Sequence, residues 1–134
     1  MTTDCEPRTR IQMAGRQPAS APGEWLVTWG VQNLGTSPLE LTQVWLPHGQ
    51  FRAPRQDIGP ALHIAPGATI HLDIHVACPL PPTGVVENAF VILTVQSEGE
   101  PWRVFARLRV TFDAEGAPLP LTEQITTQRA FPGL

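Results

Sequence analysis

Residues 68–76 read ATIHLDIHV, a stretch in which every second side chain is aliphatic. Successive side chains on a β-strand point to opposite faces, so the aliphatic residues are expected to point into a core. The polar residues between them then face solvent, which is typical of a strand in an antiparallel sheet. The turn sequence Ala65-Pro66-Gly67 precedes the strand. The inward-facing residues are Ile70, Leu72, Ile74 and Val76.

The same period of two recurs along the chain, and no segment has the i, i+3, i+4, i+7 spacing of a helix. Pro54 confines one expected strand to a sheet edge, because proline cannot donate a ladder hydrogen bond. In another strand the apolar phase changes near Gln43, which a β-bulge explains. The expected strands span residues 10–13, 24–33, 39–46, 51–58, 68–76, 89–95 and 102–112, with 119–131 as a further edge strand or an extended tail.

The composition is that of one globular domain. The chain has 134 residues, of which 42% are hydrophobic and 16% are charged. A chain of this length buries enough surface to fold without a disulfide or a metal. Its 15 prolines and 11 glycines argue against long helices. We therefore expect a single domain over residues 1–134, with a sandwich core at about 8–112 and a C-terminal extension at 113–134.

About seven short strands, with turn signals roughly every ten residues, predict an antiparallel sandwich of two sheets. Three features carry a resemblance: the sequence WGVQNLG at residues 29–35, the sequence IAPG at residues 64–67, and the closing hairpin. Together they resemble bacterial immunoglobulin-like β-sandwich domains of the cell-adhesion-related type, over residues 24 to 112. The resemblance implies an all-β immunoglobulin-like sandwich of seven or eight strands. Its motifs are turn and core signals, so it implies no chemistry.

The expected cellular setting rests on what the sequence lacks. Residues 1–7, MTTDCEP, have neither the basic nor the apolar region of a secretory signal. No run approaches the roughly 18 apolar residues of a membrane span. The two cysteines, Cys5 and Cys78, are far apart and follow no metal-type spacing. We expect a bacterial cytoplasmic protein with reduced thiols and no membrane span.

The usual signatures of catalysis are also missing. No serine lies in a G-x-S-x-G motif, no glycine-rich loop has phosphate-binding spacing, and no pair of carboxylates stands out for acid–base work. Cys78 follows His75 by three residues, and strand geometry places their side chains on opposite sides. Cys78 is therefore expected to be a buried free thiol. We expect neither enzymatic activity nor a cofactor.

One alternative function is binding of a metal or small ligand by the strand that contains His71, Asp73 and His75. Alternate residues of a strand lie about 6.5–7 Å apart on one face, so a His-x-Asp pair can supply two metal ligands. The outer two histidines lie roughly 13 Å apart, too far to share one ion. The competing interpretation is an ordinary row of solvent-facing polar residues.

The main functional hypothesis comes from one face of residues 102–112, which carries Arg103, Phe105, Arg107 and Arg109. Either other segments cover Phe105 and the arginines pair with Glu98, Glu100, Asp113 or Glu115, or this face is a binding surface. Arginine and aromatic residues are enriched where proteins bind one another.

The C-terminal residues carry a related hypothesis. A disordered tail rarely keeps residues such as Ile125 and Phe131, so the tail either packs along a sheet edge or docks on another chain. We expect a non-enzymatic interaction module, a small accessory or scaffolding subunit that binds another protein. An exposed edge also allows a homodimer. Nucleic acid is not the expected partner, because the net charge is −3.

Overall fold

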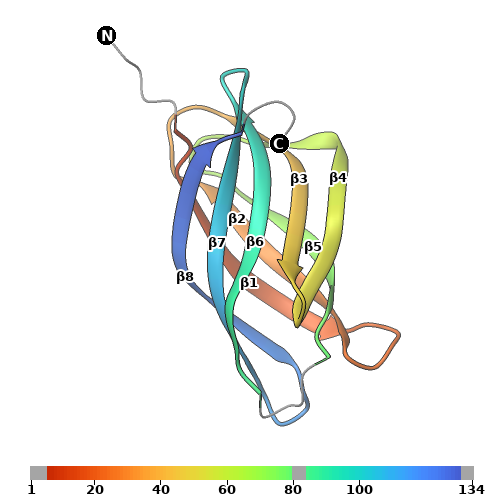
Figure 1. The fold of residues 1–134 in the computed structure, drawn as a ribbon. Helices are drawn as coiled ribbons and strands as arrows, with labels where there is room; N and C mark the ends of the chain where they lie inside the picture. The colour runs from red at the N-terminus through yellow and green to blue at the C-terminus, as the bar shows by residue number, and fades with distance from the viewer. Residues whose placement is uncertain (1–5, 80–83, 131–134) are drawn as a thin grey trace.

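The computed structural model describes residues 6–79 and 84–130, and these residues form eight β-strands (Figure 1). Within this part of the chain, no helix is long and apolar enough to cross a membrane. The strands are β1 (Thr9–Pro18), β2 (Glu24–Asn33), β3 (Leu39–His48), β4 (Phe51–Ile64), β5 (Thr69–Ala77), β6 (Val86–Ser97), β7 (Glu100–Phe112) and β8 (Pro118–Arg129).

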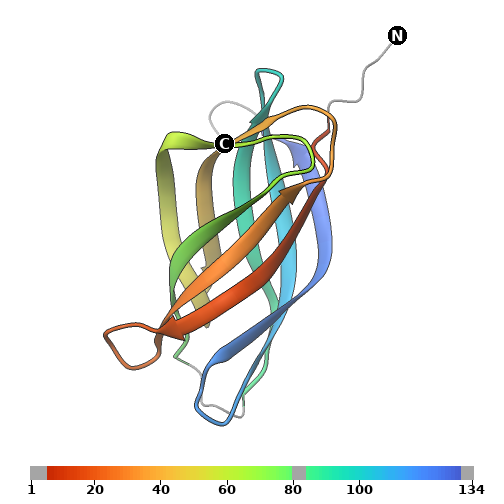
Figure 2. The same ribbon diagram turned by 180° about the vertical axis from the view of Figure 1, so that it is seen from behind.

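All eight strands belong to one antiparallel sheet, in the order β1-β2-β5-β4-β3-β6-β7-β8. The sheet curls until it nearly closes into a barrel, so that β1, β2 and β5 lie behind the other strands (Figures 1 and 2). Backbone pairing of Arg52 with Ala77 joins β4 to β5. At the other end of the order, the Thr122 hydroxyl of β8 donates a hydrogen bond of 2.7 Å to the Ile11 carbonyl of β1.

The predicted immunoglobulin-like sandwich of two sheets is therefore wrong, although the all-β class is correct. The resemblance to bacterial immunoglobulin-like domains, which implied the sandwich, is also wrong. The physical reason is that alternation along a strand shows which side chains are buried, and does not show which strand edges join. Here the pairing of β4 with β5 joins the strands into one sheet.

The core consists of every second residue of the strands. In β7, buried and half-buried residues alternate from Trp102 to Val110 without a break. Trp29 and Phe51, both fully buried, meet edge to face with their ring centroids 6.4 Å apart. Such a pair contributes about 0.5–1.5 kcal/mol beyond the area it buries. The other large side chains that are fully buried are Ile11, Leu39, Leu41, Leu46, Ile64, Ile74, Leu93 and Leu108.

The predicted bulge in β3 is confirmed. Thr42 is an extra residue opposite β6, where the register shifts between Leu41 and Gln43. Its hydroxyl donates a hydrogen bond of 3.2 Å to the Thr94 carbonyl. Before the bulge the odd-numbered residues of β3 face the core, and after it the even-numbered ones do. The shift places Trp45 on the outer surface.

The strand bounds follow the prediction closely where the pattern is regular. Strand β2 has the predicted bounds, whereas β4 continues beyond residue 58 to Ile64. The segment predicted at residues 119–131 as an edge strand or a tail forms β8, which pairs with β7 along its length. Residues 118–129 of the predicted C-terminal extension are therefore part of the sheet.

Asn33 connects the end of β2 to two other segments from a fully buried position. Its side-chain nitrogen donates to the Ser37 carbonyl at 2.8 Å and to the Ile64 carbonyl at 3.0 Å. Its side-chain oxygen accepts a hydrogen bond from the Gly35 backbone nitrogen at 2.9 Å. One amide therefore satisfies three backbone groups where the loop after β2 approaches the end of β4.

Replacing Asn33 by alanine is expected to lower the free energy of unfolding by about 2–4 kcal/mol, because buried backbone groups lose their partners. Guanidinium denaturation measures this change. The matched control is Gln32→Ala, which removes two exposed hydrogen bonds, one of 3.3 Å to the Gly67 carbonyl and one of 3.4 Å from the Arg10 guanidinium. The control should lower the free energy of unfolding by less than about 0.5 kcal/mol. Equal losses in the two variants would contradict the structural role of Asn33.

Candidate functional site

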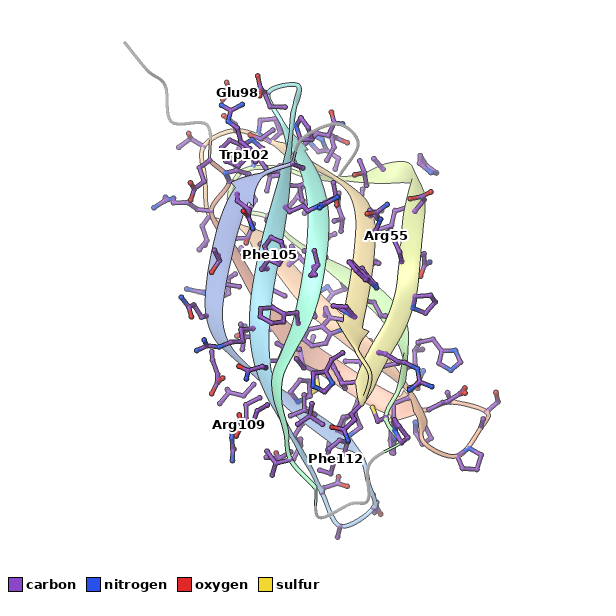
Figure 3. All side chains as sticks on the ribbon, in the orientation of Figure 1. Arg55, Glu98, Trp102, Phe105, Arg109 and Phe112 are labelled. Atoms are coloured by element: carbon purple, nitrogen blue, oxygen red, sulfur yellow. The ribbon has the colours of Figure 1, made fainter. Side chains whose placement is uncertain are left out.

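Strand β7 carries the four predicted partner-binding residues on its outer face. Arg103, Phe105, Arg107 and Arg109 are half-buried and alternate with buried residues. In Figure 3, Phe105 lies near the middle of β7 and Arg109 lies further along it, toward the loop that leads to β8. The structure thus brings the four residues together as the sequence pattern predicts.

Phe105 belongs to a row of large apolar side chains that crosses three neighbouring strands. Ile92 of β6 is paired with Phe105 of β7 on one side and with Trp45 of β3 on the other. Phe90, on the same face of β6, meets Phe105 edge to face with the ring centroids 6.5 Å apart. All four side chains are half-buried. We call Trp45, Phe90, Ile92 and Phe105 the outer apolar cluster.

Of this cluster, the predicted binding face contains only Phe105. Residues 89–95 are apolar on both faces, a pattern that predicts a central strand and does not single out Phe90 or Ile92. The structure covers only the inner face, so Phe90 and Ile92 face outward. The signal that pointed to Trp45 was the bulge near Gln43, which reverses the direction of the side chains that follow it.

Carboxylates from adjacent strands hold two of the arginines. Nε of Arg109 lies 3.1 Å from Oε2 of Glu87 on β6, and Nε of Arg107 lies 3.7 Å from Oε1 of Glu123 on β8. These side chains are 33–57% exposed, so each pair contributes at most about 1 kcal/mol. The expected pairing of arginines with acids holds for these two, but their partners are strand residues. Of the expected turn residues, Glu100 instead pairs with Arg129 and Asp113 pairs with Arg16.

The C-terminal strand contributes less to this surface than the sequence suggested. Ile125 is paired with Ala106, and it packs against the core from the inner side of β8. Phe131 lies outside the described residues. Residues 118–129 pack back on the sheet, so the outer surface beside β7 is formed by polar residues of β8 and by Leu121, which is 64% exposed and paired with Arg109.

The histidine strand is β5, and His71, Asp73 and His75 share its outer face as predicted. The Thr28 hydroxyl donates a hydrogen bond of 2.6 Å to Oδ1 of Asp73, and Nε2 of His75 lies 2.7 Å from Oε1 of Glu24. In the described part of the chain, no three His, Cys, Asp or Glu side chains are grouped closely enough to hold a metal ion. The alternative of a metal site therefore has at most two protein ligands at any one point of this strand.

Cys78 lies directly after β5 and is only 3% exposed. It has no disulfide partner among the described residues, and Cys5 lies outside them. Burial raises the pKa of the Cys78 thiol to about 12, because a thiolate loses its hydration inside the protein. A thiol in this state is a poor nucleophile.

Cys78 is expected to resist thiol reagents in the folded protein. The raised pKa lowers the thiolate fraction at pH 8 by roughly a thousandfold relative to an ordinary cysteine. In a Cys5→Ser variant, Ellman's reagent should detect no fast-reacting thiol in buffer and one full thiol in guanidinium. Fast reaction in buffer would contradict the burial of Cys78.

Comparisons with known proteins assign no family. No family model matches the sequence, and no curated protein matches it. Among solved structures, the chain is similar to one described as "X-ray structure of Northeast Structural Genomics Consortium target SoR45". The identity is 16%, the TM-score is 0.40, and the match covers 96% of this chain and 87% of that chain. This similarity assigns neither a family nor a function.

Proposed function

We propose that this protein is a non-enzymatic interaction module that binds another protein through the outer apolar cluster, together with Arg103 and Arg107. The observation that supports the proposal is the row of three side chains, Trp45, Ile92 and Phe105, in register across three strands. Strands that face water on one side usually carry polar residues there. A continuous apolar row at that place favours contact with another surface.

The chemistry of this surface suits a protein partner. Aromatic residues and arginine are enriched in the centres of protein interfaces, where they supply apolar area and directional hydrogen bonds. The half-exposed pair of Arg107 with Glu123 lies at the border of the cluster, where partner groups can replace water. A net charge of −3 gives no general attraction for nucleic acid.

The competing explanation is that the cluster only stabilises the sheet. Cross-strand pairs such as Ile92 with Phe105 contribute roughly 0.2–1 kcal/mol each. The two explanations differ in what a truncation of the cluster does. Loss of a stabilising pair changes the melting temperature and leaves binding alone, whereas loss of a binding surface does the reverse.

The double variant Phe105→Ala/Arg107→Ala is expected to lose its partner while its melting temperature falls by only about 2–6 °C. The fall is small because both side chains are half-buried. Tagged protein is purified gently from its native cells, and the proteins that come with it are quantified by mass spectrometry. Calorimetry of the purified variants gives the melting temperatures.

The matched control is Arg10→Ala/Gln12→Ala, two exposed residues on the outer side of β1. A stoichiometric protein that is retained by the wild type and by this control, and lost from the β7 variant, is the expected result. The proposal fails if all three forms retain the same proteins. It also fails if the β7 variant melts more than about 15 °C lower, because the face would then belong to the core.

A further inference from the structure

Strands β4 and β5 are neighbours in the sheet but are hardly paired. Along its other edge, β5 pairs with β2 over its whole length, from Thr69 to Ala77. Toward β4, the only backbone pairing within the described residues is that of Arg52 with Ala77. In an antiparallel strand, alternate residues direct both backbone groups to the same side. Half of the backbone groups of β5 therefore face β4 without a strand to pair with. We call the gap between β4 and residues 69–76 the seam.

The seam leaves part of the core incompletely covered. Ile70 and Leu72 point inward from β5 like the buried Ile74, yet they are only half-buried. On the opposite side, Ile58 and Leu62 of β4 are also half-buried and pack against the core. These aliphatic side chains lie on both sides of the seam, away from the pair of Arg52 with Ala77 that closes it at one end.

The edge of β5 is the more suitable of the two for an added strand. Its sequence from Thr69 to Ala77 contains no proline and alternates without a bulge. Strand β4 contains Pro54 and Pro60, and its register with β3 is interrupted over residues 58–61. Prolines and bulges are the usual protection of an exposed edge, and β5 has neither.

A groove lies where the seam closes. Its volume is about 500 Å³, and both strands line it together with the end of β3. Trp45, Pro47 and Pro54 supply apolar walls, and Arg52, His75 and Glu24 supply polar ones, with Nε2 of His75 lying 2.7 Å from Oε1 of Glu24. A pocket of this size holds one or two side chains of a bound peptide.

The charges beside the groove favour an acidic ligand. Among the described residues, neither Arg52 nor Arg55 has a carboxylate partner within 4.0 Å, and the same holds for Arg8, just before β1, and Arg10, on β1. Arg52 donates to the Gly49 carbonyl, and the Arg55 guanidinium lies 4.4 Å from the ring centroid of Trp45. In Figure 3, Arg55 lies beside β3 and β4 on the same side of the molecule as Phe105. Both guanidiniums are placed to bind carboxylates of a ligand.

We propose that an extended, acidic segment of a partner protein binds in the seam as an additional strand. Its backbone pairs with the free edge of β5, its alternate apolar side chains cover Ile70 and Leu72, and its carboxylates bind Arg52 and Arg55. Only a polypeptide offers donors and acceptors at the spacing of a strand. The segment is therefore a peptide and not a small molecule.

The state of the seam is tested first in the free protein. Hydrogen exchange of ¹⁵N-labelled full-length chain should show alternating rates over residues 69–76. Amides that face β2 should exchange slowly, because they are in the ladder, and amides that face the seam should exchange fast. Uniformly slow exchange over this strand would show that the seam is closed, and would overturn the proposal.

Binding is tested with a displayed library of random dodecapeptides against the full-length protein. The expected binders have apolar residues at alternate positions and at least one Asp or Glu, and they slow the fast amides of β5. The double variant Arg52→Glu/Arg55→Glu should bind a synthetic copy of such a peptide with an affinity at least about tenfold lower than that of the wild type. The matched control, Arg10→Glu, reverses an exposed arginine on β1 and should change the affinity by less than about twofold.

Three outcomes would overturn the proposal: no enriched peptide, binders that leave the β5 amides unprotected, or a free protein that dimerises and protects those amides as its concentration rises. The last outcome would mean that a second copy occupies the seam. The variant Phe105→Ala/Arg107→Ala should bind the peptide normally, because these residues lie on β7. Failure of the proposal for the seam can therefore be distinguished from failure of the proposal for the outer apolar cluster.

Discussion

The bulge at Thr42 is the constraint on which the arrangement of both candidate surfaces depends. Without the extra residue, the phase set by Leu41 would turn Trp45 inward and the even-numbered residues of the strand outward. Leu46 would then lose a fully buried position, which is worth about 1.5–3 kcal/mol for an aliphatic side chain. The bulge keeps this apolar area in the core and still directs Trp45 to the outside. There Trp45 pairs across to Ile92 and also lines the groove beside Pro54.

The two places where the sheet could open are closed by different means. Between β8 and β1, the hydroxyl of Thr122 reaches the Ile11 carbonyl, and Arg16 of β1 pairs with Asp113 at 3.1 Å. The backbone nitrogen of Ala117, and more weakly Arg16, hold the pKa of Asp113 below its usual value. Side chains and a loop therefore tie this junction over several residues. The junction of β4 with β5 is joined instead by one backbone residue pair.

The sequence predicted the elements of this fold well, because alternation is a local signal. The predicted bounds of β2 agree with the structure to the residue, and the phase change near Gln43 corresponds to the bulge at Thr42. The sheet architecture was predicted wrongly, because the edge joined by Arg52 and Ala77 is a non-local contact that alternation does not encode. The same limit applies to the site. Phe105 was found from its own strand, whereas its neighbour Ile92 comes from a strand that is apolar on both faces.

The charged groups of both candidate surfaces contribute little to the free energy of folding. Two half-exposed ion pairs beside the outer apolar cluster add little to folding, and the guanidiniums of Arg52 and Arg55 have no carboxylate to add to it at all. Small polar residues in place of the outer aromatic side chains would satisfy a strand that faces water. The two surfaces also differ in kind, because Arg107 and Arg109, which pair with acids, lie beside an apolar row, whereas Arg52 and Arg55 lie beside a groove. Arg52 and Arg55 place two positive charges beside the groove of a chain whose net charge is −3. In the proposal made above, these charges would attract an acidic segment, whereas the row on β3, β6 and β7 would gain most of its binding free energy from burial. The two proposals are compatible, because the surfaces share only Trp45.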